Sequence, residues 1–173
     1  GMDRKAAAAY LVGYLSWELS LVLALMRLTG SGAPAVPSTA IVAQIEPYEL
    51  EGNRYLRTNL RLVDQHAPCL PLDAAGISRL LADWFTPFLA QLHIASQLGR
   101  NALWRIVGDN VAAAWLGIGG MAGDRQRAMA DAEAVIHAEG SPFSNKQLRF
   151  IHIEARDPAE PGTIIDQEWF RIR

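Results

Sequence analysis

The chain has 173 residues, of which 50% are hydrophobic and 20% are charged, and its formal net charge is −2. This composition suits one core built without disulfides or metal, and it argues against a dedicated nucleic-acid binder, which usually carries a strong basic excess. The single cysteine, Cys69, excludes a cysteine-held metal or iron–sulfur site within the chain and fits a reducing, cytoplasmic compartment. Gly1 before Met2 resembles an expression-tag scar, so we take residues 2–173 as a single domain.

The first predicted helix is capped by Asp3 and runs to about Thr29. It is apolar and nearly long enough to suggest a membrane span, which needs about 20 apolar residues. Glu18 in its middle, with Ser16 and Ser20 beside it, would be costly in lipid. The apolar stretch also exceeds the roughly 7–15 residues of a signal peptide. We therefore expect a core helix and no stable membrane span.

A β-hairpin is predicted next, because a β-branched run at 39–45 and an alternating run at 55–63 are joined by a turn at 50–53. The second run has an apolar face and a polar, basic face. Its apolar face holds Leu56, Thr58, Leu60 and Leu62, and its polar face holds Arg57, Asn59 and Arg61.

The middle of the chain is predicted to be helical. Asp73 caps a helix over 74–98, which Pro87 should end or kink before Gly99 stops it. The following helix, over 102–116, should be broken by the glycines at 117, 119, 120 and 123, and Asp124 opens another to about residue 138.

Two alternating runs, at 148–155 and 163–172, predict a second hairpin. The fold class is therefore α+β, a helical body flanked by two β-hairpins that could share one antiparallel sheet.

Motifs of common catalytic sites are not convincing here. The stretch 117–122 matches a G-x-G-x-x-A nucleotide fingerprint, but it follows a predicted helix where that motif needs a strand. The histidines lack metal-ligand spacing, so we predict structural roles for them and no metal site. Cys69 is expected to be a small buried thiol, although a hydrolase using Cys69 and His66 stays open as a weaker option. We predict no catalytic residue.

One helix carries two tryptophans and several charges. Trp104 and Trp115 lie near Arg100, and Arg105 and Asp109 have the i, i+4 spacing of a surface ion pair. The simpler interpretation is buried tryptophans beside a surface pair. The functional alternative is a rim where aromatic and basic groups receive an anionic, partly aromatic ligand. The hairpin arginines named above are then either a solvated face or part of the same pocket.

The segment from Leu98 to Ala112, LGRNALWRIVGDNVA, resembles the Arg…Leu-Trp…Asp/Asn…Ala helix of the ferric-siderophore reductase (FhuF-like) family. The glycine-rich turn, second helix and terminal strands ending in Trp169–Arg173 follow in a similar order. The resemblance implies a siderophore-linked role in iron utilisation, with a body that binds a ferric siderophore. The ligand-binding residues that it implies are Arg100, Trp104, Arg105 and Asp109.

In that family a [2Fe–2S] cluster carries the reduction, held by cysteines of a C-terminal motif. This chain ends at Arg173, about where that motif would begin, and one cysteine cannot supply four ligands. We therefore expect no cofactor in this chain, and an oxidoreductase only if the native protein continues into such a motif. The alternative is a non-catalytic interaction or scaffold domain whose apolar first helix packs into a homo-oligomer, for example a homodimer.

Overall fold

The computed structural model describes residues 3–34, 36–63, 69–71 and 73–172, and its α+β architecture confirms the predicted fold class. Four α-helices form the body: α1 (Arg4–Thr29), α2 (Ala74–Ser96), α3 (Arg100–Ala122) and α4 (Arg125–Ile136). A short 3₁₀ helix, η1 (Ser38–Ala40), precedes the first hairpin.

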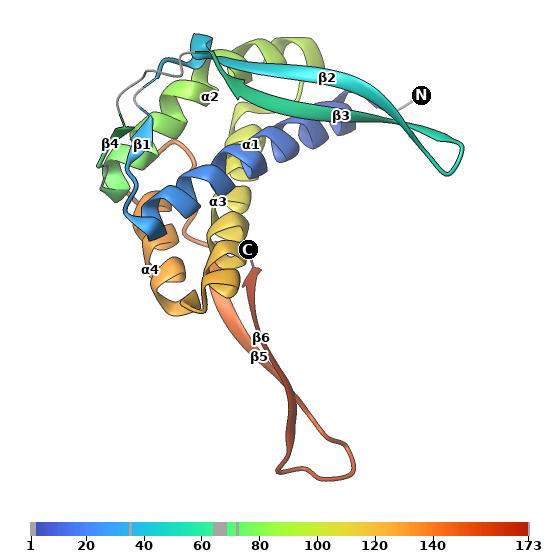
Figure 1. The fold of residues 1–173 in the computed structure, drawn as a ribbon, viewed down its shortest axis with the longest axis vertical. Helices are drawn as coiled ribbons and strands as arrows, with labels where there is room; N and C mark the ends of the chain where they lie inside the picture. The colour runs from blue at the N-terminus through green and yellow to red at the C-terminus, as the bar shows by residue number, and fades with distance from the viewer. Residues whose placement is uncertain (1–2, 35, 64–68, 72, 173) are drawn as a thin grey trace.

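The strands form three separate antiparallel pairs within the described part of the chain. The long pairs are β2 (Ile41–Leu50) with β3 (Asn53–Leu62), and β5 (Arg149–Arg156) with β6 (Ile164–Ile172). The short pair is β1 (Ala33–Pro34) with β4 (Cys69–Leu70). Both predicted hairpins are present, but they do not share a sheet, because they leave the helical body in different directions (Figure 1).

Helix α1 packs along α3 with one face and exposes the other. The Asp3 carboxylate accepts the backbone N–H of Lys5, and Gly30 ends the helix in the left-handed conformation at φ 73°. By length and composition alone α1 could cross a membrane, and 28% of its most apolar window is buried in the fold. That it does not span a membrane stays a prediction.

Helix α2 continues through Pro87, so of the two expected effects, an end or a kink, the end is wrong. Proline removes one backbone donor, but Leu81, Phe85 and Leu89 are all buried in the core on both sides of it. Tertiary packing therefore outweighs the lost hydrogen bond. The helix ends at Ser96, before the expected stop at residue 99.

Helix α3 also continues beyond its expected end at residue 116, through Gly117, Gly119 and Gly120, and stops at Gly123 with φ 73°. The prediction that the glycine cluster breaks this helix is wrong. The glycines are placed where neighbouring elements approach the helix: a Cβ at Gly119 would lie 3.1 Å from the Cα of Arg125, the first residue of α4. Close helix packing, and not a turn, explains them.

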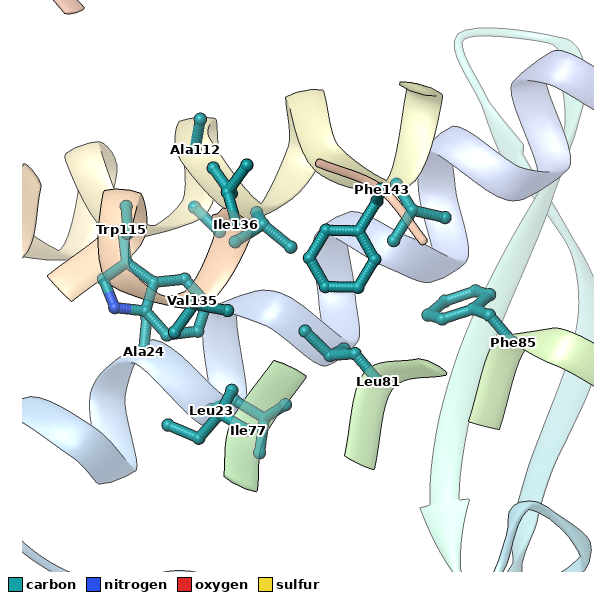
Figure 2. Packing of buried hydrophobic residues seen from close by; sticks show 14 of the residues in the cluster. Leu23, Ala24, Ile77, Leu81, Phe85, Ala112, Trp115, Val135, Ile136 and Phe143 are labelled. Atoms are coloured by element: carbon teal, nitrogen blue, oxygen red, sulfur yellow. The ribbon is translucent and has the colours of Figure 1, made fainter. Parts of the chain in front are cut away.

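The core lies between the four helices. In Figure 2 the ring of Trp115, from α3, lies beside Ala24 of α1 and Val135 of α4. Trp115 is completely buried, and Phe143, from the loop after α4, is 1% exposed. Each aromatic ring removes a large apolar area from water, so this cluster is the main source of stability.

Candidate functional site

The four residues predicted to face a ligand lie in the N-terminal half of α3. Arg100 and Arg105 are exposed. Trp104 is half-buried, and its ring centroid lies 6.1 Å from that of Phe143. Asp109 is half-buried, with one carboxylate oxygen shielded from solvent. None of the four lines the hollows described below, so their role in recognition stays a prediction.

A hollow of about 720 Å³ lies between α1 and the hairpin of β2 and β3, and we call it the hairpin hollow. Its volume lies in the range of small-molecule sites, about 300–1,000 Å³. Its polar and aromatic lining consists of Tyr14, Glu18, Arg57, Asn59, Arg61 and Trp84. Its apolar lining consists of Leu19, Val22, Ile41 and Leu60.

Two arginines bring positive charge to the hairpin hollow. Arg57 and Arg61 share one face of β3, and their four-residue spacing separates their Cα atoms by roughly 13 Å. The guanidinium of Arg57 lies 5.0 Å from the ring centroid of Tyr48 on β2, a cation–π contact that orients it. The two arginines therefore line a hollow, but it is not the pocket beside Trp104 that one of the two sequence interpretations expected. The opposite wall of this hollow is α1, and not the helix that carries Trp104.

The α1 wall presents Tyr14, Glu18 and Val22, which recur every fourth residue and so form one stripe. The Tyr14 hydroxyl donates a hydrogen bond to the Glu18 carboxylate. Burial, and next the negative charge of Glu18, raise the pKa of Tyr14 above its ordinary value, although Arg57 opposes the shift. The phenol is therefore neutral at physiological pH and keeps its proton for hydrogen bonding.

Sequence reasoning missed this wall. The available signal was Glu18, a carboxylate in the middle of an apolar helix, which served only as an argument against a membrane span. Its neighbour at i−4, Tyr14, would have shown where the polar part of the helix lies. The pairing of this stripe with β3 could not be read from the sequence.

Trp84 of α2 lies between the hairpin hollow and a second, apolar hollow of about 340 Å³. Its indole N–H donates to the backbone oxygen of Val36 at 2.8 Å, and this hydrogen bond fixes the position of the ring. Only 5% of the residue is exposed. The second hollow is lined by Phe85 and Phe88 of the same helix. The two hollows are adjacent, and both are lined by Trp84 and by the apolar side chains of Leu19, Ile41 and Leu60.

Cys69 is exposed on β4, so the expectation of a buried thiol is wrong. The reason is local: β4 is a two-residue strand that pairs only with β1. The other member of the suggested Cys/His dyad, His66, lies outside the described residues. The weaker hydrolase option therefore stays a prediction.

The described ranges contain no group of three or more His, Cys, Asp or Glu side chains placed to hold a metal ion. The sequence has a single cysteine, whereas a [2Fe–2S] cluster is held by four thiolates or by thiolates with histidines. The donor set of this chain therefore does not fit the cluster that the family resemblance implies. We assign no electron-transfer step to its residues.

Comparison of the chain with protein-family models, with curated proteins and with solved structures finds no match in any of the three. The resemblance of the segment in α3 to ferric-siderophore reductases therefore stays a prediction.

Proposed function

We propose that this chain binds a ferric siderophore in the hairpin hollow. The observation that carries the proposal is the position of Arg57 and Arg61, which both open into a hollow of about 720 Å³ that also has apolar walls. A ferric siderophore presents anionic oxygen donors around its iron on an organic scaffold. Guanidinium groups form charge-assisted hydrogen bonds with such oxygens.

The anionic and the apolar parts of the ligand bind to different walls of the hollow. Arg57 and Arg61 receive the anionic oxygens, and the apolar side chains of Leu19 and Val22 pack against the organic part of the ligand. Glu18 repels anionic groups from the α1 wall, so the ligand's charge is directed toward the hairpin. The proposal assigns ligand binding, and no reduction, to the described residues.

Titration with a ferric tris-catecholate and a ferric trihydroxamate tests this proposal through quenching of tryptophan fluorescence, which Trp84 reports from the wall of the hollow. We expect saturable quenching by at least one ligand. The double variant Arg57→Gln/Arg61→Gln should bind about tenfold more weakly, equivalent to roughly 1.4 kcal/mol. The matched control is Arg54→Gln, an exposed arginine on the opposite face of β3, which should leave affinity unchanged.

Two results would contradict the proposal. One is the absence of saturable quenching with both ligands. The other is equal weakening by the double variant and by Arg54→Gln, because that pattern indicates a general effect of net charge.

A homodimeric scaffold domain is a second candidate, favoured by one specific observation. The hairpin of β5 and β6 extends away from the helical body (Figure 1), and most of its residues are exposed. They include Ile153 and Phe170, which lie on the same face of the hairpin. A two-stranded hairpin alone in water is only marginally stable, so a second copy covering this face would stabilise it.

Light scattering over a concentration series tests the dimer. We expect Phe170→Lys to shift the protein toward monomer, while Ile94→Lys, a change at a more exposed apolar residue of α2, leaves the mass unchanged. A monomer at every concentration up to about 1 mM, a Kd equivalent to only about 4 kcal/mol, would eliminate this candidate.

A further inference from the structure

A separate hollow of about 520 Å³ lies between α1, the C-terminal half of α3 and the end of β6, and we call it the tryptophan hollow. It shares no lining residue with the hairpin hollow. In Figure 1 the end of β6 returns to the side of α3, and contacts between these elements hold it there. The residues that matter are Trp17, Gly117, Gly120, Arg125, Trp169 and Arg171.

Two half-buried indole rings line this hollow. The ring of Trp17 lies beside the backbone of α3, where a Cβ at Gly117 would be 3.8 Å away, an ordinary contact distance. Trp169 contacts the ring of His152 on the neighbouring strand, with ring centroids 4.8 Å apart. The contact orients Trp169 from one side. Indole rings in such positions offer flat surfaces for stacking with another ring.

Two guanidinium groups complete the lining. A Cβ at Gly120 would lie 3.0 Å from Nε of Arg125, so the missing side chain allows this guanidinium to lie close to α3. Arg171 enters from β6. The one carboxylate in the lining, Glu168, lies 3.8 Å from Arg125, and both side chains are substantially exposed, so the pair is weak. The hollow therefore keeps a net positive charge.

From these features we infer that the tryptophan hollow is a second binding site, which takes a planar aromatic anion. The ring of the ligand stacks on Trp17 and Trp169, and its anionic group pairs with Arg125 and Arg171. The glycines of α3 keep the hollow open, because a larger side chain at Gly117 would project into it. The inference does not depend on siderophore binding, since the two hollows have no residue in common.

The test follows the indole N–H signals of the five tryptophans by NMR while 2-naphthoate is added. We expect saturable shifts of the Trp17 and Trp169 signals, with Trp84, Trp104 and Trp115 unaffected. Cyclohexanecarboxylate, which has the charge without the flat ring, should bind at least fivefold more weakly. So should 2-naphthylmethanol, which has the ring without the charge.

Amino-acid substitutions distinguish a specific binding site from general electrostatic attraction. Arg171→Gln should weaken 2-naphthoate at least fivefold, whereas Arg149→Gln, an exposed arginine on the partner strand that does not line the hollow, should not. Gly117→Leu should abolish the shifts by filling the space, and leucine suits a helix, so this variant should fold. Shifts spread over all five indoles, or equal effects of the two arginine variants, would overturn the inference. Siderophore binding would be untouched by that result.

Discussion

Replacing Gly119 by alanine tests whether the glycines of α3 are there for helix packing. In an exposed helix, Gly→Ala stabilises by about 0.8–1 kcal/mol, because glycine loses more conformational freedom on folding. At Gly119, however, the new Cβ would overlap the Cβ of Ala128 and lie 3.2 Å from the backbone oxygen of Asp124. These neighbours belong to α4 and its cap, so a side-chain rotation cannot relieve the overlap.

The magnitude follows from the two opposing effects. Overpacking a close contact costs about 1–3 kcal/mol, which exceeds the gain in helix propensity. We expect Gly119→Ala to lower the free energy of unfolding by up to about 2 kcal/mol. The matched control is Gly117→Ala in the same helix, where the nearest atom, in the ring of Trp17, is 3.8 Å away. That change should raise stability by up to about 1 kcal/mol.

Urea denaturation followed by circular dichroism measures both variants, with the slope of the transition as a check on two-state behaviour. Adding Ala128→Gly to Gly119→Ala should restore space, giving a favourable interaction energy of about 1 kcal/mol in the double-mutant cycle. Equal stability of the Gly119→Ala and Gly117→Ala proteins would refute the packing argument.

Two further predictions concern α1. Ser20 is completely buried, and its hydroxyl has no hydrogen-bond partner among the described residues, so Ser20→Ala should raise the free energy of unfolding by about 1 kcal/mol. Ser16→Ala should change the free energy of unfolding by less than about 0.5 kcal/mol, because the Ser16 hydroxyl donates to the backbone oxygen of Val12 at 2.6 Å and this bond is lost. Equal gains of the two variants in urea denaturation would contradict both predictions. The pKa of Tyr14 is raised by burial and by Glu18. The stabilisation that the neutral phenol provides is therefore complete below the ordinary pKa of 10.0, and it is lost as the pH rises through the higher pKa of the folded state. Absorbance titration should show a late step from Tyr14, and Glu18→Gln should bring that step earlier. A Tyr14→Phe protein that keeps the late step would show that the assignment is wrong.

The hairpin hollow depends on side chains that come from distant parts of the chain. The stripe of Tyr14 and Glu18 lies about forty residues before Arg57 in the sequence, and Trp84 follows later. Each of these residues has an ordinary explanation in its own element: an aromatic and an acid on a helix, an arginine on a polar strand face, a tryptophan in a core. Only the position of the hairpin over α1 brings them together.

The same contrast between local spacing and tertiary contacts explains why the sequence placed the ligand-binding residues on α3. Arg100, Trp104, Arg105 and Asp109 are close in sequence, and local spacing made them the natural candidates. In the fold, Trp104 lies against Phe143, a residue of the loop after α4. Spacing along one helix therefore identified neighbours, whereas each hollow is formed where elements distant in the sequence meet.

The amino-acid sequence by itself determined the fold class, both long hairpins and the beginnings of three helices. Those beginnings were predictable because a cap acts over two or three residues: Asp73 accepts the backbone N–H of Gly76 at 2.7 Å, and Asp124 accepts that of Arg127. Tertiary structure alone decided that Pro87 and the α3 glycines stay within their helices, since packing against other helices outweighs local propensity. It also decided that the hairpins stand apart and that the hollows exist, because both depend on contacts between segments far apart in the chain.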